Sequence, residues 1–305
     1  MPDRKPIVVV GSINMDLVAT APHIPAPGET ILGTGFETHP GGKGANQAVA
    51  AARLGVPVQM IGLLGSDDLG KQLRAGLQST GVDTTAVGTV PGSSGVALIT
   101  VSAKGENSIV VASGANMQVT PAYLDQHADR IRSAGIVLAQ LEIPLESVLH
   151  LAKLCSDAKV PLILDPAPAQ KLPESLYPQV AWFTPNETEA AFYIGETEKN
   201  LNKSAQQLQA KGIGGVILKL GAKGSFLATK SGTEAAIKAF KVHAVDTTAA
   251  GDAFNGAFAA ALTLGQSPLE AAIFASAASA ISVTRKGAQP SMATSQEVHE
   301  LLGDA

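Results

Sequence analysis

The sequence predicts an α/β fold: a doubly wound, mostly parallel sheet flanked by helices, with a small antiparallel β lid. Short β-branched runs alternate with amphipathic stretches along most of the chain, and several of these stretches begin at helix-capping residues. Residues 17–40 and 94–113 break this alternation and predict the lid. The chain has 305 residues, of which 45% are hydrophobic, so we expect a single domain over residues 1–305.

The expected elements of the main sheet follow in βαβ order. A first strand begins at Ile7, an Ala-rich helix covers residues 43–54, and a second strand covers residues 58–65. Leucines at helical spacing then predict a helix after Ser66. The remaining elements are a helix opened by Thr120 and Pro121, a strand over 136–142, a helix from Pro144, a strand over 161–166, a helix after Asn186 and a strand over 215–221.

The lid is predicted from two segments of different character. Residues 94–113 form two alternating arms around the turn from Lys104 to Asn107, which favours a hairpin, and residues 17–40 are rich in Pro, Gly and Thr. We expect both to cover the crevice at the carboxyl ends of the parallel strands, where open α/β sheets bind their ligands.

Composition excludes several classes of protein. A net charge of −4 and 4% aromatic residues argue against a basic, stacking surface for nucleic acid. The apolar stretches near 256–264 and 271–283 are shorter than a membrane span of about 20 residues. Since the start of the chain lacks a signal-peptide core, we expect a soluble, cytoplasmic protein without nucleic-acid or membrane partners. The single cysteine, Cys155, is expected to pack as a small apolar residue in a helix.

Residues 246–258 form the most informative segment, because a polar turn runs directly into a small-residue helix. The backbone amides of Ala249, Ala250, Gly251 and Asp252 are expected to be unpaired donors that, with the helix dipole, bind an anion. Asp252 would repel a bound phosphate, which suggests that it takes a proton from an attacking hydroxyl. The alternative is an acid that only stabilises the first helical turn.

A second segment, Gly41-Gly42-Lys43-Gly44-Ala45-Asn46, also runs from a glycine turn into a helix. It is not a Walker A loop, because Gly44 follows the lysine and the spacing of the glycines differs. Together with GSINMD at 11–16, PAPGET at 25–30, PNETEA at 185–190 and TRKGAQPS at 284–291, the two segments resemble the ribokinase-like (PfkB) family of sugar kinases. The resemblance spans some 280 residues. It implies ATP-dependent phosphorylation of D-ribose at its 5-hydroxyl, the same fold with its lid, and a homodimer through the lids.

The resemblance implies a sugar site in the glycine turn and after two strands. Asn14 and Asp16 follow the first strand, Glu142 ends another, and carboxylates and amides bind vicinal hydroxyls well. Simple loop capping by Asn14 and Asp16, and a tight turn with a solvated lysine, remain alternatives. The full set implied for the sugar is Ser12, Ile13, Asn14, Asp16, Gly41, Gly42, Lys43, Gly44, Ala45, Asn46, Glu142 and Asp252.

The nucleotide and metal sites are implied in the same way. Asn186 lies near the phosphates and Glu189 places Mg²⁺ through water, although the two residues could also form a plain capping box. Many relatives have Thr where Lys219 stands, and a mobile ammonium could replace the lost hydroxyl contact. The residues implied for ATP are Asn186, Glu189, Lys219, Leu220, Gly221, Ala222, Lys223, Gly224, Gly251 and Ser276.

A monovalent cation, K⁺, is implied behind the Ala-Ala-Gly-Asp turn. Its ligands would be largely backbone carbonyls at Asp246, Thr248, Ser282, Arg285, Gly287 and Ser291. The alternative is that Arg285 and Lys286 are a solvated helix end. Four other functions are alternatives. They are a kinase of 2-deoxyribose or fructose, a nucleoside kinase, which the few aromatic residues disfavour, a non-catalytic sugar-binding protein, and a Rossmann dehydrogenase, whose glycine pattern is missing after the first strand.

Overall fold

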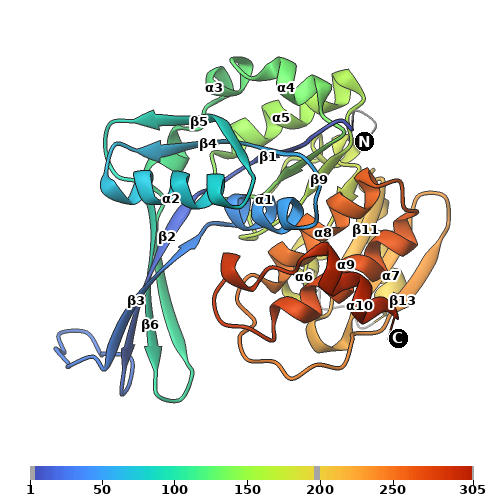
Figure 1. The fold of residues 1–305 in the computed structure, drawn as a ribbon. Helices are drawn as coiled ribbons and strands as arrows, with labels where there is room; N and C mark the ends of the chain where they lie inside the picture. The colour runs from blue at the N-terminus through green and yellow to red at the C-terminus, as the bar shows by residue number, and fades with distance from the viewer. Residues whose placement is uncertain (1–3, 196–199, 304–305) are drawn as a thin grey trace.

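The computed structural model describes residues 4–195 and 200–303 and contains a large and a small sheet (Figure 1). Within these residues the large sheet has the strand order β13-β12-β11-β10-β9-β8-β1-β4-β5. Neighbouring strands from β5 to β11 pair in parallel, and β12 and β13 add antiparallel, which confirms a mostly parallel sheet. The strands are β1 (Ile7–Val10), β4 (Val58–Gly65), β5 (Asp83–Val90), β8 (Ile136–Ala139), β9 (Leu162–Leu164), β10 (Trp182–Phe183), β11 (Gly215–Lys219), β12 (Ser225–Thr229) and β13 (Glu234–Ile237).

Helices cover both faces of the large sheet, as the alternating pattern predicts. Ile7 and Val9 of β1 pack in the core of one face, and Val8 and Val10 pack in the core of the other, so every residue of this strand is buried. The first face carries α1 (Lys43–Arg53), α2 (Asp68–Ser79), α8 (Ala250–Thr263), α9 (Pro268–Ser282) and α10 (Ser295–Gly303). The second carries α3 (Pro121–Asp125), α4 (Ala128–Ser133), α5 (Leu145–Ala158), α6 (Glu187–Ile194) and α7 (Leu201–Gln209). Cys155 lies fully buried in α5, as expected.

The strand order places a switch point beside β1. From β1 the chain proceeds through β4 and β5 on one side and, later, through β8 to β11 on the other. Ligands of such sheets bind at the carboxyl ends of the strands next to this point. The strand expected over residues 136–142 ends at Ala139, so Gln140, Leu141 and Glu142 leave the sheet at this edge.

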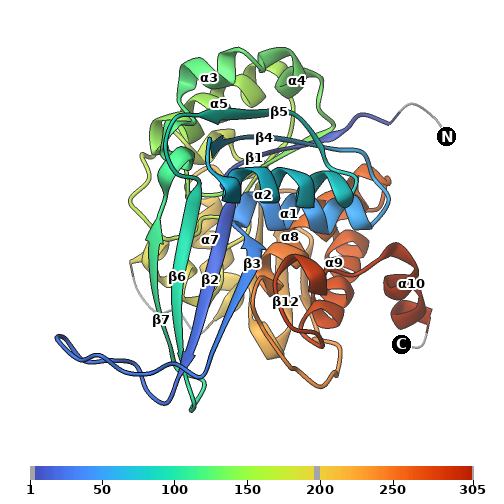
Figure 2. The same cartoon turned by 60° about the vertical axis from the view of Figure 1, so that its left-hand side comes forward.

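The small sheet projects from the body at the same edge (Figure 2). Its order is β3 (Gly35–Gly41), β2 (Asn14–Ala21), β6 (Gly95–Ser102) and β7 (Asn107–Ala112). The outer pairs β2–β3 and β6–β7 are antiparallel, and the hairpin turn lies where the sequence predicts it. The central pair β2–β6 is parallel, and both of these strands run away from the body (Figure 2).

Four short 3₁₀ helices complete the described elements: η1 (Gly114–Gln118), η2 (Tyr177–Gln179), η3 (Gly221–Lys223) and η4 (Gln289–Ser291). None of the helices in the described ranges is both long enough and apolar enough to cross a bilayer.

Candidate active site

The helix α8 begins at the predicted anion-binding turn. Ala249 caps it with a left-handed φ of 58°, and no side chain caps the amides of the first turn. The amide of Ala250 donates to Thr247 O at 3.3 Å, so the prediction that it is free is wrong: the turn uses this donor locally. For Ala249, Gly251 and Asp252 the described residues provide no backbone acceptor. Three amides and the positive end of the helix dipole therefore remain for an anion.

Asp252 lies in this first turn, with 6% of its surface exposed, and both carboxylate oxygens are held by α1. Asn46 Nδ2 donates to Oδ2 at 3.0 Å, and Gln47 Nε2 donates to Oδ1 at 3.0 Å. Burial raises the pKa of Asp252 to about 6, against the lowering effect of the Lys43 ammonium. An exposed aspartate has a pKa of about 4, so the site makes Asp252 a stronger base than its residue type suggests.

The glycine turn is tied closely to the segment after β1. A Cβ on Gly44 would lie 2.8 Å from Ser12 N, and one on Gly42, where φ is 88°, would lie 2.7 Å from Asn14 N. A Cβ on Gly41 would lie 2.5 Å from the Asp16 carboxylate. Glycine is therefore required for this close approach, which brings the start of α1 against the start of β2.

The predicted sugar residues lie together at this contact. Ser12 Oγ donates to Glu142 Oε2 at 2.5 Å, and Lys43 N donates to the same oxygen at 3.2 Å. Burial raises the pKa of Asp16 to about 6, and the charge of Glu142 adds to this effect. Desolvation opposes the charged form of Lys43, but the carboxylates of Asp252, Asp165 and Glu142 raise its pKa overall. Negatively charged, positively charged and neutral hydrogen-bonding groups thus meet at one edge of the sheet.

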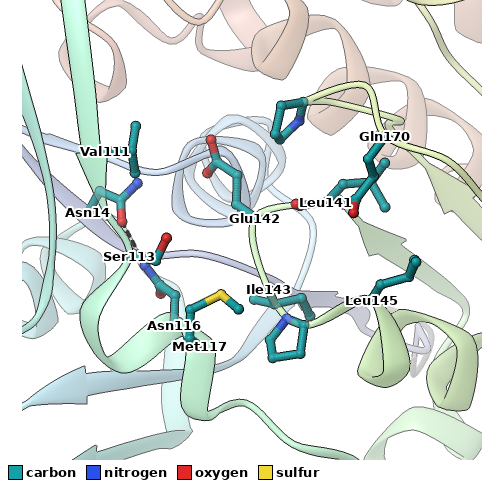
Figure 3. Close-up of a pocket in the computed structure, with 12 residues that line it drawn as sticks. Asn14, Val111, Ser113, Asn116, Met117, Leu141, Glu142, Ile143, Leu145 and Gln170 are labelled. Carbon is teal, nitrogen blue, oxygen red and sulfur yellow. Dashed lines mark hydrogen bonds between the residues drawn. The ribbon is translucent and has the colours of Figure 1, made fainter. Parts of the chain in front are cut away.

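A cavity of about 270 Å³ opens beside this cluster (Figure 3). Asn14 and Glu142 point into it, and Val111 from the lid closes one side. The other sugar residues named above, including Asp16 and Lys43, lie outside its lining. Apolar side chains supply much of the rest of the wall: Met117, Leu141, Ile143, Pro144, Leu145 and Pro168.

The nucleotide residues occupy the adjacent strand ends. Asn186 Oδ1 accepts from Glu189 N at 2.8 Å, and Glu189 Oε2 accepts from Asn186 N at 2.9 Å, which is a complete capping box. The two residues therefore do cap α6, as the alternative interpretation of the sequence predicts. The second carboxylate oxygen of Glu189, Oε1, takes no part in the capping box. Lys219 ends β11 and Gly221 opens η3, so the loop Lys219–Gly224 lies beside Asn186, with which Lys219 forms a bridge.

Two of the residues implied for the nucleotide, Leu220 and Ser276, have side chains that contact the protein interior. Leu220 packs in the core with 7% exposure, so only its backbone can face a ligand. Ser276 is buried, donates to Ala272 O at 2.9 Å and lies 3.4 Å from Ser225 Oγ. Its hydroxyl is thus directed at α9 and β12.

The six candidate cation ligands lie in the loop before α8 and in the stretch from the end of α9 to the end of η4, and Asp246 joins these two segments. Its Oδ1 accepts from Thr248 N at 2.9 Å, and its Oδ2 accepts from Gly287 N at 2.9 Å. The hydroxyls of Ser282 and Ser291 donate to the carbonyls of Ser279 and Ala288, so their protons point away from any ion bound between the loops. The Arg285 guanidinium pairs with Glu297 of α10, so it is not a freely solvated helix end.

Four residues of the site were missed by the sequence analysis. Asp165 and Gln140 follow strands β9 and β8, and the rule that selected Glu142 could have selected them. Gln47 lies one residue beyond the glycine motif. Asn116 lies in η1, with Nδ2 donating to Asn14 Oδ1 at 2.7 Å and Oδ1 accepting from Ile13 N at 2.9 Å. No local signal marks it, because its partners are about a hundred residues away.

A buried carboxylate beside free helix-terminal amides, next to a cluster of hydroxyl-binding groups, defines a phosphotransferase that acts on an alcohol. Comparison with known proteins leads to the same class. The chain belongs to the pfkB family of carbohydrate kinases, whose family model matches residues 4–295. It is an ATP-dependent sugar kinase, and the predicted family is confirmed.

The similar proteins cover nearly the whole chain. A ribokinase of Haemophilus influenzae is 45% identical over 306 residues, which cover 99% of this chain and 100% of that protein. The structure of Arabidopsis thaliana ribokinase complexed with ribose and ATP matches with a TM-score of 0.93 and 37% identity, covering 98% of this chain and 99% of the other. A deoxyribokinase of Salmonella typhi is 37% identical over 302 residues, covering 97% and 98%.

Proposed function

We propose that this sugar kinase transfers the γ-phosphoryl group of ATP to the 5-hydroxyl of D-ribose, giving ribose 5-phosphate and ADP. The observation that carries the proposal is Asp252, a buried carboxylate whose two oxygens are fixed by Asn46 and Gln47 at the free amides of α8. The relative from Haemophilus influenzae and the Arabidopsis complex with ribose and ATP support ribose as the acceptor.

In the proposed reaction, the sugar lies in the cavity lined by Asn14 and Glu142 with its 5-hydroxyl toward Asp252. The hydroxyl oxygen forms a bond to the γ-phosphorus while the bond from phosphorus to the ADP oxygen breaks, and the hydroxyl proton passes to Asp252. A carboxylate of pKa about 6 is largely ionised at neutral pH and can accept that proton late in the step. The amides of Gly251 and Asp252 then bind the charge on the transferring group.

The donor set also fits ATP with Mg²⁺. The described residues contain no cluster of three or more acidic, histidine or cysteine side chains that could enclose a metal. Mg²⁺ commonly keeps several waters and binds substrate phosphates with one or two carboxylates, so Glu189, with one oxygen outside its capping box, fits such an ion. Mg²⁺ would neutralise phosphate charge, and Asn186 and the Lys219–Gly224 loop would hold the nucleotide.

The cation loops fit K⁺ through backbone carbonyls. Asp246 holds the two loops together, and its neighbour Thr248 leads directly into the anion-binding turn. A bound K⁺ would therefore fix the direction of the amides without touching the sugar. We expect strong activation by K⁺ and weak activation by Na⁺, because carbonyl cages discriminate by size and field strength.

Ion specificity is tested by measuring turnover in K⁺, Na⁺ and tetramethylammonium at matched ionic strength, so that screening is constant. Equal rates in all three salts would mean that the loops at Asp246 and Gly287 are only structural.

The acceptor is tested with an ADP-release assay on purified protein over pentoses, hexoses and nucleosides. We expect the highest kcat/KM with D-ribose and loss of turnover in the Asp252→Asn variant, which serves as the matched blank. A higher kcat/KM with 2-deoxyribose, fructose or a nucleoside would show that ribose is not the preferred substrate, while the assignment as a kinase would stand.

We further propose that the enzyme is cytoplasmic, because its phosphoryl donor is ATP. We also propose a homodimer, which the apolar outer face of the lid supports.

A further inference from the structure

Lys219 forms a buried ion pair with Asp165, a residue that the sequence analysis did not select. The Nζ atom lies 2.9 Å from Asp165 Oδ1, and the two side chains are 14% and 3% exposed. Lys219 ends β11 and Asp165 follows β9, so the pair spans the ligand-binding edge of the sheet. Asp165 accepts one of the three N–H donors of the ammonium, and no other acceptor for Nζ is found among the described residues.

The ammonium of Lys219 lies against the first turn of α8. A Cβ placed on Gly251 would be 3.3 Å from Nζ and 3.9 Å from Cε of this lysine. Gly251 contributes one of the free amides of the anion-binding turn. A fixed positive charge is thus added to the amides and the helix dipole at the point where Asp252 would meet the transferring group.

The other oxygen of Asp165 is linked to the base. Gln47 Nε2 donates to Asp165 Oδ2 at 2.9 Å and also to Asp252 Oδ1 at 3.0 Å. Gln140 Nε2 donates to Gln47 Oε1 at 2.7 Å, which fixes the amide so that its NH₂ group faces both carboxylates. A continuous chain of contacts therefore runs from the ammonium through Asp165 and Gln47 to Asp252.

We propose that Lys219 is a catalytic residue that binds the γ-phosphoryl group during transfer, and that Asp165 is the positioning residue that fixes its ammonium and, through Gln47, the carboxylate of Asp252. This inference rests on the proposed phosphoryl transfer from ATP. The sequence suggested a mobile ammonium at this position, whereas the ion pair holds it in place. Preorganisation matters here, because a charge that is already aimed stabilises the transition state without reorganising.

The γ-phosphoryl contact is tested by calorimetry with two nucleotides in the presence of Mg²⁺. Lys219→Met should weaken binding of the non-hydrolysable analogue AMP-PNP by about 10-fold or more, since contacts to charged groups are strong. The dissociation constant of ADP, which lacks the γ-phosphoryl group, should change less than about twofold on the same argument. Lys153→Met, which breaks an exposed Lys–Asp pair on α5, is the matched control and should change neither. The assignment is overturned if Lys219→Met weakens the binding of ADP and AMP-PNP equally, or if it weakens the binding of neither nucleotide.

The role in turnover is tested with a second pair of variants, because Lys219→Met alone leaves the buried Asp165 charge unpaired. The double variant Asp165→Asn/Lys219→Met removes both charges, and we expect it to remain about 10²-fold below wild type in kcat, like the loss of one oxyanion donor. Its KM for the sugar should be unchanged. Recovery of wild-type kcat in the double variant would show that only the unpaired charge was harmful and would overturn the proposal.

Asp165→Asn alone gives a readout that a purely structural role would not change. The charged groups around Asp252 are Lys43 of α1, Asp16 of β2, Lys219 and Asp165, and the negative charge of Asp165 raises the pKa of Asp252. Its removal should shift the acid limb of kcat/KM to lower pH, and an unshifted limb contradicts the link. If wild type phosphorylates no sugar, the proposed function fails, and the AMP-PNP titration still decides the Lys219 contact.

Discussion

At the scale of single residues, the environment of Asp252 matters more than its place in a motif. Its carboxylate is buried, accepts two hydrogen bonds from α1 and faces the Lys43 ammonium. The hydrogen bonds and the lysine favour the charged form, while burial opposes it more strongly. The result is a base whose pKa lies between that of a free aspartate and neutrality, which suits proton transfer near pH 7.

The first prediction concerns this base. Asp252→Asn should lower kcat by about 10² to 10⁴, because the amide cannot accept the hydroxyl proton. In wild type, the ionised carboxylate is the active form and its pKa is about 6. The value of kcat/KM should therefore be constant above pH 7 and fall about tenfold per unit below pH 6. Steady-state rates from pH 5 to 9 and circular dichroism of the variant are the measurements, and a well-folded Asn variant with wild-type turnover would rule out the base.

The second prediction concerns Asn116, which orients Asn14. Since Asn14 Oδ1 accepts from Asn116 Nδ2, the Asn14 NH₂ group remains available to the cavity. Asn116→Ala should raise KM for ribose and reduce the preference for ribose over 2-deoxyribose by about 10-fold, because the Asn14 amide can then rotate. The comparison is kcat/KM for both sugars in wild type, Asn14→Ala and Asn116→Ala. We expect the Asn14 NH₂ group to bind the hydroxyl that 2-deoxyribose lacks, so equal values for the two sugars in wild type would contradict this role.

At the scale of elements, the contact between α1 and α8 sets the geometry of the site. Asn46 and Gln47 of α1 hold Asp252 of α8, so a shift of one helix moves the base relative to its donors. The helices approach closely at Gly256, where a Cβ would lie 2.6 Å from both Ala50 Cβ and Gln47 O. Backbone atoms supply part of this contact, and they cannot move aside as a flexible side chain could.

The third prediction is that Gly256→Ala separates the two helices. We expect a loss of about 1–3 kcal/mol in the free energy of unfolding, as for overpacked cores, together with a lower kcat. Gly76→Ala on α2 is the control, because a Cβ there meets nothing within 4 Å, and it should stabilise by about 0.5–1 kcal/mol. Urea denaturation and turnover of both variants test this. Identical behaviour of the two alanine variants would mean that the α1–α8 contact is more adaptable than its geometry indicates.

At the scale of the whole molecule, the lid leaves an apolar face uncovered. Leu98 of β6 and Val110 of β7 are direct cross-strand neighbours and are 50% and 62% exposed. Phe36 of β3, 65% exposed, lies on the same small sheet. Contiguous exposed apolar side chains on a soluble domain commonly mark an interface. The lid of a second copy offers the same apolar face, as a two-fold interface requires.

The fourth prediction is that this face forms the dimer. Wild type should show the mass of two 31.0 kDa chains by light scattering, and Leu98→Asp should shift it to one, because a charge would be buried at the interface. Phe192→Asp on α6, where the side chain is 48% exposed, is the control away from the lid. A monomeric wild type, or a dimeric Leu98→Asp variant, would contradict a dimer through the lid.

Local sequence signals were enough to predict the elements and much of the site. Periodicity predicted the parallel sheet, capping residues predicted the starts of α3 and α6, and the glycine turns located the starts of α1 and α8. These features depend on neighbours within a few residues, because backbone hydrogen bonds of helices and turns are local. Backbone detail within a turn is less visible: the sequence did not show that Ala250 N donates to Thr247 O, because this bond depends on turn angles such as the left-handed φ of Ala249.

The tertiary structure alone decided which distant groups meet. Gln47 contacts Asp165 across 118 positions and Asp252 across 205, and Asn116 contacts Asn14 across 102. The parallel pairing of β2 with β6 and the ion pair of Lys219 with Asp165 are of the same kind. The sequence by itself determined the fold class, the family and the residue types at the strand ends. Packing determined their partners, and with them the pKa of the base, because burial and charge act through space and leave no periodic trace along the chain.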